Sequence, residues 1–393
     1  MRNIDIIEDI ATREARGLVR LDLDLDLDSP EEERTKKSPR VAFEKNDMGR
    51  LEARGAGHAG HENANRMDIV CDFLNRSVLP YTEAESRGLL RGTSYAIELH
   101  DSYRWPPLSG VTTEDEVPRD VADRYAGKLV FSRGKRDRGP VLFPDVSQIM
   151  NHFGTLRVAD PSSSSSSRPW SQKKKTMFFA GSTTGRREPE RNARINACVW
   201  SLDHRDISEF YITHITQMER AHALARVPRL ADCYKPPVLN KEGRPSFAYD
   251  AHHHFLHRIG VNLPGNTCSW TRVPSVLNSR SVLFDDAFQR DTVWYTPLLQ
   301  DGVHYVATDM GVHRNERGEM LWSNSSSTPV KDARNDLEHH DLVRKYLRFV
   351  EDEARCSAMA DAANTIVKEF LLAPHAASYA KTLFETSAFL SAP

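Results

Sequence analysis

The stretch Pro264–Phe284, "PGNTCSWTRVPSVLNSRSVLF", joins a turn-like segment to two short apolar segments. Its pattern predicts a polar loop leading into a helix at Val273–Leu277, then a turn and a short buried strand at Ser281–Phe284. Backbone N–H groups point outward where a loop meets a helix N-terminus, and the helix dipole favours an anion there. Arg272 lies at this junction, where a guanidinium can bind phosphate oxygens or pair with a neighbouring carboxylate. The pattern alone leaves both partners open.

The composition is that of a soluble globular protein, with 393 residues, 39% of them hydrophobic and 27% charged. This length suits two ordinary domains. A net charge of −2 gives no reason to expect nucleic acid as a partner, and no run approaches the roughly 18 apolar residues of a membrane span. The beginning, "MRNIDIIEDIATREARG", lacks the apolar core of a secretory signal. We therefore expect the cytoplasm, or the secretory pathway if the N-terminus is incomplete.

The first 168 residues divide into two compositionally different parts. Residues 1–65 are predicted to form a disordered or atypical arm, because "LDLDLDLD" at Leu21–Asp28 has Asp, a poor strand former, at every second position. Residues 66–168 contain short strand-like segments and are predicted to form an N-terminal, acceptor-side lobe. This lobe ends in "DPSSSSSSRPW" at Asp160–Trp170, whose composition is typical of a flexible linker.

Buried strands and helices alternate after the linker. "TMFFA", "EFYITHI", "HFLHRIGVNL" and "VHYVATD" are the strand-like segments, and amphipathic stretches separate them. Such alternation predicts a parallel sheet covered by helices over residues 169–345, with a polar surface insertion at 311–334. Apolar residues at helical spacing predict that residues 346–393 are helices. The fold class is therefore α/β.

A second loop, "FFAGSTTG", also follows a predicted strand. Gly181 allows the backbone to approach a ligand, and Ser182, Thr183 and Thr184 offer hydroxyl groups. Four arginines follow it: Arg186, Arg187, Arg191 and Arg194. The loop matches neither a Walker A motif nor GxGxxG, so a phosphate-binding loop and an ordinary turn with a solvated basic face are both open. Two such loops at strand ends of one parallel sheet favour phosphate binding, since open parallel sheets bind ligands there.

These segments, together with "WYTPLLQDGVHYV" and the C-terminal "DLVRKYLRFVEDEARCSAMADAANTIVKEFL", resemble glycosyltransferase family 90. That family includes protein O-glucosyltransferases and fungal capsule-associated xylosyltransferases. The similarity covers residues 90–390 and is densest over 175–305. It implies a GT-B fold, in which two Rossmann-like lobes face a cleft and the C-terminal lobe binds a UDP-sugar. It further implies an inverting transfer of glucose or xylose to a hydroxyl of a glycan or glycoprotein acceptor, with no metal or other cofactor.

The resemblance also implies roles for individual donor-binding residues. Arg272 resembles the arginine that binds the donor pyrophosphate, and Arg191, in "PER", resembles a second arginine that reaches the phosphates. The remaining donor-binding positions are the loop residues Gly181, Ser182 and Thr184, and the nucleotide-covering residues Asn266, Thr267, Cys268 and Ser269. Two positions depart from the family, since Ala180 replaces an arginine and Val293 replaces an acidic residue. These departures favour the alternative of a relative that binds a sugar nucleotide without catalysis.

Asp101, in "IELHDSYRWP", resembles the aspartate that the family places at the end of a strand in the acceptor-side lobe. A carboxylate there would take the proton of the acceptor hydroxyl as its oxygen attacks the anomeric carbon. From the residues alone, a turn-capping role for Asp101 is the alternative. A phosphate-ester hydrolase lacks support, because no metal-carboxylate cluster or nucleophile motif is visible. His252–His254 and His257 are interpreted as a partly exposed helix face, so no metal ligands are predicted.

Overall fold

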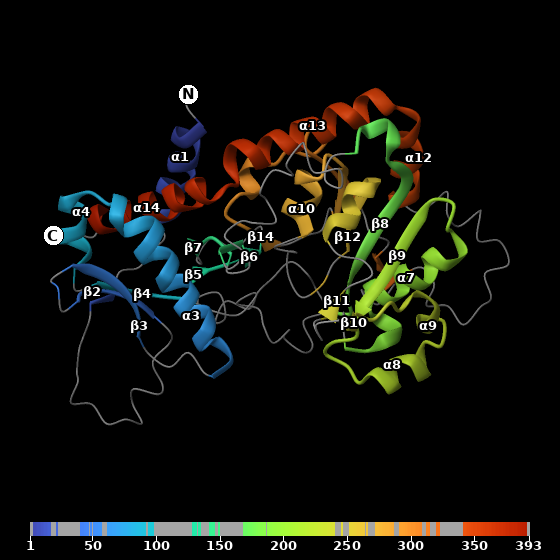
Figure 1. The fold of residues 1–393 in the computed structure, drawn as a ribbon, viewed down its shortest axis with the longest axis horizontal. Helices are drawn as coiled ribbons and strands as arrows, with labels where there is room; N and C mark the ends of the chain where they lie inside the picture. Colours follow the sequence, from blue (N-terminus) through green and yellow to red (C-terminus); the bar gives the residue numbers. More distant parts are fainter. Residues whose placement is uncertain are drawn as a thin grey trace. The chain divides into compact units, whose positions relative to one another are not determined.

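The computed structural model divides the chain into two compact units, each described here by itself (Figure 1). Unit 1 comprises Met1–Gly154, Arg290–Pro297 and Glu369–Pro393, and unit 2 comprises Thr155–Gln289 and Leu298–Lys368. The structure describes residues 3–16, 21–22, 40–46, 48, 50–56, 61–91, 93–97, 128–131, 133–134, 141–145, 148–149, 168–185, 187–239, 245–246, 251–263, 265, 272–286, 291–308, 312–314, 320–322 and 341–390.

Unit 1 contains an antiparallel sheet with the strand order β1-β4-β2-β3. The strands are β1 (Leu21–Asp22), β4 (Thr93–Ala96), β2 (Arg40–Lys45) and β3 (Leu51–Ala56). The helices are α1 (Asn3–Ala15), α3 (His61–Phe73), α4 (Ala84–Leu90) and α14 (Ala373–Leu390), and a π-helical turn (Leu74–Val78) extends α3. Two small strand pairs complete the unit: parallel β5 (Leu129–Val130) with β7 (Val141–Leu142), and antiparallel β6 (Arg133–Gly134) with β14 (Asp291–Thr292).

Part of the predicted N-terminal arm belongs to the folded core of unit 1. Ile7, Ile10 and Ala11 are buried and recur at helical spacing, and α1 packs against α14. On β2, Phe43 lies 5.1 Å from the ring of Phe384 of α14. Helix α1, β2 and β3 were therefore not anticipated by the interpretation of residues 1–65 as a disordered or atypical arm. The aspartate-rich repeat contributes only Leu21–Asp22 to the described sheet, and its remaining residues lie outside the described part.

Unit 2 is built on a parallel sheet of five strands in the order β15-β13-β12-β8-β9, which confirms the predicted α/β class (Figure 1). The strands are β8 (Lys174–Ser182), β9 (Ser208–His214), β12 (His257–Asn262), β13 (Val282–Asp286) and β15 (Tyr305–Thr308). The helices are α7 (Ala193–Asp203), α8 (Arg220–Arg226), α9 (Leu230–Cys233), α10 (Arg272–Asn278), α12 (Asp341–Glu351) and α13 (Glu353–Phe370). The predicted C-terminal helices are thus present as α12, α13 and α14.

The central strand β12 is buried along its whole length, as expected for a strand covered on both faces. Ile259 and Val261 contribute to a core that includes Phe179 of β8 and Ile195 of α7. On β12, Gly260 is required by close packing, because a Cβ there would lie 2.7 Å from the methyl groups of Val276 in α10. The sheet thus forms a rigid support for the loops that follow its strands.

The opening stretch folds close to its prediction. Helix α10 spans Arg272–Asn278 where Val273–Leu277 was predicted, and β13 spans Val282–Asp286 where Ser281–Phe284 was predicted. Helix α7 begins at Ala193, after Pro189–Arg191 has formed a 3-10 turn.

Two short hairpins and a 3-10 turn also belong to unit 2. The predicted insertion at 311–334 contains the hairpin of β16 (Val312–Arg314) and β17 (Met320–Trp322), and β10 (Val238–Leu239) pairs with β11 (Pro245–Ser246). A 3-10 turn at Ala251–Leu256 leads into β12. Among the described helices of the whole chain, none combines the length and apolarity needed to cross a membrane.

Candidate functional site

The candidate site lies where the parallel strands of unit 2 end, at what we call the carboxyl edge. The loop Ser182–Gly185 follows β8, residues 215–217 follow β9, and Leu263 and Gly265 follow β12. Open parallel sheets bind ligands at this edge because loops and helix starts gather there. The described residues of the two loops singled out in the sequence therefore belong to the same edge.

Arg272, the first residue of α10, reaches across the ends of β12 and β8. Its Nη2 donates to the carbonyl of Ala180 at 2.9 Å, its Nη1 lies 3.4 Å from Oδ1 of Asn262, and its Cζ is 4.4 Å from the centre of the Phe179 ring. Among the described residues Arg272 makes no ion pair. Burial lowers the pKa of Arg272 to about 10, while Cys198 and Asp285 act in the opposite direction.

Gly181 makes room for this guanidinium. A Cβ at Gly181 would overlap Nη2 of Arg272 and would lie 3.0 Å from Cζ of Phe179. The sequence interpretation gave Gly181 a role in the approach of the backbone to a ligand, whereas here it lets an arginine side chain lie on the end of β8. Next to it, the hydroxyl of Ser182 makes no hydrogen bond to any described residue and is therefore available to a ligand.

Arg194, on the first turn of α7, connects the loops after β8 and β12. Its Nη1 donates to the carbonyl of Ser182 at 3.1 Å and to Oγ1 of Thr184, and its Nη2 donates to the carbonyl of Leu263 at 3.2 Å. Its Cζ lies 5.8 Å from the centre of the same Phe179 ring. Burial, with a further contribution from the charge of Arg272, lowers the pKa of Arg194 well below its ordinary value.

Asn192 and Gly265 help to fix this arrangement. Oδ1 of Asn192 caps α7 by accepting from the backbone N–H groups of Arg194 and Ile195, and its Nδ2 donates to the carbonyl of Thr183 at 2.8 Å. A Cβ at Gly265 would lie 2.8 Å from Cζ of Arg194 and 2.9 Å from Oγ1 of Thr184. The loop after β12 is therefore close to both.

The chemical consequence is a concentration of positive charge in a buried setting. Two guanidinium groups flank one aromatic ring, and each binds neutral backbone or side-chain oxygens at the sheet end. A guanidinium removed from water is destabilised unless negative charge compensates it. The carboxyl edge is consequently suited to an anion with several oxygen atoms, such as a phosphate.

Several predicted site residues lie outside the part of the chain that the structure describes: Asp101, Asn266, Thr267, Cys268 and Ser269. The backbone of Arg191 belongs to the 3-10 turn before α7. Of the predicted donor-binding set, the structure brings together Gly181, Ser182, Thr184 and Arg272.

Sequence reasoning missed three residues of this edge. Asn192 had a visible signal, because an asparagine directly before a helix is a preferred N-cap residue. Asn262 and Gln217 had no such sequence signal. In the structure, Nδ2 of Asn262 donates to Oδ1 of Asp285 at 2.9 Å. Their importance comes from neighbours that are distant in the sequence.

The histidine cluster is a packing feature rather than an exposed face. His254 and His257 are buried, and His257 stacks on Phe178 with the ring centres 4.5 Å apart. Burial lowers the pKa of His254, and it lowers that of His257 to about 4, so both rings are neutral at pH 7. The expectation of a partly exposed helix face is therefore wrong for these two residues. Within the described residues, no group of three or more His, Cys, Asp or Glu side chains is arranged for a metal.

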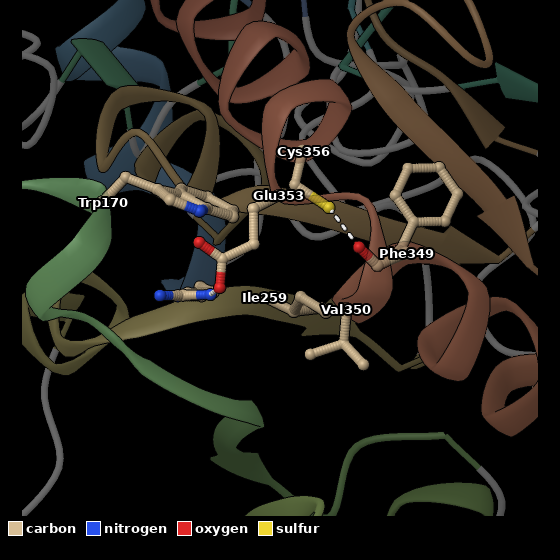
Figure 2. Close-up of a pocket in the computed structure, with 7 residues that line it drawn as sticks. Trp170, Ile259, Phe349, Val350, Glu353 and Cys356 are labelled. Atoms are coloured by element: carbon tan, nitrogen blue, oxygen red, sulfur yellow. Dashed lines mark hydrogen bonds and ion pairs between the residues drawn. The ribbon is translucent and has the colours of Figure 1, made fainter.

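A cavity lies at the opposite, amino end of β12 (Figure 2). The space between its lining atoms totals about 200 Å³, which includes space open to solvent. This space is divided into gaps that are each too narrow for a water molecule. Its lining consists of Trp170, Arg258, Ile259, Phe349, Val350, Glu353 and Cys356. Figure 2 shows the Cys356 sulfur directed at the Phe349 carbonyl, to which it donates at 2.7 Å. This cavity is a packing gap between β12 and the helices α12 and α13.

In comparisons with known proteins, no family model matches the chain and no curated protein matches it. The resemblance to glycosyltransferase family 90 therefore stays a prediction from the sequence motifs.

Proposed function

We propose that the protein is an inverting, metal-independent glycosyltransferase that moves a sugar, glucose or xylose, from a UDP-sugar to a hydroxyl of a glycan or glycoprotein. The observation that carries the proposal is the pair of guanidiniums at the carboxyl edge, Arg194 buried and Arg272 partly buried, of which Arg272 makes no ion pair within the described residues. In a GT-B arrangement, unit 2 would be the nucleotide-sugar-binding lobe and unit 1 the acceptor-side lobe.

The diphosphate of the donor would be bound by Arg272. Among the described residues, two contacts hold this guanidinium in place, to Ala180 and Asn262, and the remaining N–H groups of its fork would donate to phosphate oxygens. The hydroxyl of Ser182, the last residue of β8, would add a neutral hydrogen-bond donor. Because these groups are already oriented and partly buried, they would stabilise the negative charge that develops on the leaving UDP without a metal ion.

In the proposed reaction, Asp101 is the general base. The acceptor oxygen attacks the anomeric carbon, its proton passes to the carboxylate of Asp101, and the bond between the anomeric carbon and the UDP oxygen breaks. Only one displacement occurs, so the configuration at the anomeric carbon inverts. Asp101 lies outside the described residues, and its role rests on the resemblance of "IELHDSYRWP" to the family motif.

The alternative is a relative that binds a sugar nucleotide without transferring the sugar. It is favoured by Ala180, which replaces a family arginine, and by Val293, which replaces an acidic residue and is buried in unit 1. Against it, the carbonyl of Ala180 accepts from Arg272, so this position still contributes to the edge through its backbone.

The test combines binding with turnover. UDP is expected to raise the thermal midpoint and uridine is not, because the phosphates are the groups bound and a ligand of the folded state stabilises it. A panel of UDP-sugars then identifies the donor by release of UDP with and without acceptor. Asp101→Asn should retain the UDP-induced shift while transfer falls by roughly two to four orders of magnitude. A well-folded protein that shows no UDP-dependent shift contradicts the proposal, and binding without any turnover supports the alternative.

A further inference from the structure

The loop after β9 is joined to the candidate phosphate-binding loop after β8 by several hydrogen bonds. The backbone N–H of Thr183 donates to the carbonyl of His214 at 3.0 Å. Oγ1 of Thr183 donates to the carbonyl of Thr216 at 2.8 Å and accepts from the N–H of Thr216 at 2.8 Å. The two loops therefore keep a fixed spacing beyond the ends of their strands.

Gln217 adds a contact at the far end of the β8 loop. Its side-chain Oε1 accepts from the backbone N–H of Gly185 at 3.2 Å. Gly185 itself has φ of 119°, which only glycine adopts readily. The side chain of Gln217 thus fixes the residue at which the β8 loop turns.

The backbone of Gln217 is held in an unfavourable conformation. Its φ is 66°, in the left-handed region that residues with a Cβ avoid. Arg280, with φ of 55°, is the other non-glycine residue with positive φ in the described part of the chain. Arg280 follows α10 at the position where helices commonly end in this conformation. Gln217 follows a strand, so no helix end explains it, and such conformations persist where the surroundings impose them, often at functional sites.

We propose that Gln217 is a positioning residue of the donor site, an inference that rests on the proposed function. Its side chain holds Gly185 from the β9 side, while Asn192 and Arg194 hold the carbonyls of Thr183 and Ser182 from the α7 side. The loop between these contacts carries Ser182, which directly follows Gly181, the residue on which the Arg272 guanidinium lies. A loop that is fixed before binding loses less conformational freedom when the diphosphate binds, which strengthens binding.

The test compares Gln217→Asn with the matched control Arg280→Asn. Asparagine tolerates the left-handed region better than other residues with a Cβ, so neither backbone is forced to change. At position 217, however, the side chain is one methylene too short to reach Gly185. Arg280→Asn also removes an exposed ion pair with Asp361, and such pairs contribute little to stability, so both variants should have a thermal midpoint close to that of the wild type. By calorimetry, UDP affinity should fall about threefold to tenfold in Gln217→Asn, the worth of one hydrogen bond, and stay unchanged in Arg280→Asn.

Hydrogen exchange separates positioning from a general loss of structure. Faster exchange in Gln217→Asn should be confined to the peptide containing Gly185, while β8 and β9 stay protected. Unchanged UDP affinity in Gln217→Asn overturns this inference alone, and so does an affinity loss accompanied by a lower thermal midpoint and exchange throughout the sheet. Absence of UDP binding by the wild-type protein contradicts the proposed function and this inference with it.

Discussion

Arg258, which is buried, and Arg272, which is partly buried, are two arginines of unit 2 that lie near opposite ends of the same strand, β12. Arg258, the second residue of β12, has a side chain that is 7% exposed, and its Nη1 lies 2.6 Å from Oε1 of Glu353, whose side chain is 49% exposed. Arg272 lies beside Asn262, the last residue of β12, and contacts a carbonyl and an amide oxygen. One guanidinium is balanced by a carboxylate of the protein, and the other makes no ion pair with any described residue.

The difference indicates where an external anion belongs. A buried cation without a counter-charge lowers stability, and such groups are retained mainly where they serve a function. Arg258 fills a structural role, since its charge is matched and its Cζ lies 5.5 Å from the ring centre of Trp170. The arginine at the amino end of β12 is therefore paired with a carboxylate, whereas the arginine at the carboxyl edge has no carboxylate partner among the described residues and could pair with an anionic ligand.

The largest expected effect is that of Arg272→Ala on ligand binding. Loss of a charge-assisted contact of about 1.5–3 kcal/mol should weaken UDP binding roughly 10- to 150-fold. The free energy of unfolding should stay the same or rise, because the variant removes a buried charge. Calorimetry with UDP and urea unfolding give the two values. If UDP affinity is unchanged in Arg272→Ala, Arg272 does not bind the phosphates and does not differ from Arg258 in this respect.

Arg258→Met is expected to show the opposite behaviour, with a smaller effect. UDP affinity should match that of the wild type, because Arg258 lies at the amino end of the sheet. The free energy of unfolding should fall by about 1–2 kcal/mol through loss of a charged hydrogen bond to a half-exposed partner, while the methionine retains much of the packing on Trp170. Urea unfolding measures this loss. Weakened UDP binding together with intact stability would assign Arg258, rather than Arg272, to the ligand.

The parallel sheet and the elements around the opening stretch were predictable because their signals are local. Apolar runs such as "TMFFA" and "HRIGVN" specify buried strands, and the polar segment before Val273 marks a helix start. The same reasoning placed Ser182, Thr184 and Arg272 after strands or before a helix. It identified residue types with the right chemistry at the ends of the right elements.

The partners of these residues were not predictable, because they come from distant parts of the chain. Arg272 donates to the carbonyl of Ala180, 92 positions earlier in the chain. Gln217 stands out through its positive φ, which the amino-acid sequence does not predict. The run Lys173–Lys175 shows the same limit. Three consecutive lysines are typical of a solvated charge run, yet the Lys173 side chain is buried. Sequence patterns report polarity, whereas burial depends on what the fold places over a residue.

Lys173 provides the last and smallest prediction, because it is buried at the amino end of the sheet and pairs with no carboxylate among the described residues. Its Nζ donates to the carbonyl of Ser279 at 2.6 Å and to Oγ of Ser281 at 2.8 Å. Burial, with a smaller effect of Arg280, lowers the pKa of Lys173 to about 7. An amine can lose its proton in such a place, whereas a guanidinium cannot, so this site needs no external anion.

The sign of the pH dependence follows from this lowered pKa. Between pH 7 and about 10 the unfolded chain keeps the Lys173 proton while the folded protein releases it, so the unfolded state binds more protons. Stability should therefore rise with pH in this window, by at most about 1.4 kcal/mol per pH unit from this residue. Urea unfolding of the wild type and of Lys173→Met at pH 7, 8 and 9 isolates its contribution, because other titrating groups cancel in the difference. A difference that stays constant with pH would mean that Lys173 remains charged in the folded protein. The folded chain would then tolerate a buried cation with no described carboxylate partner at the amino end of the sheet. In that case, the lack of a carboxylate partner at Arg272 would not by itself indicate a ligand site at the carboxyl edge.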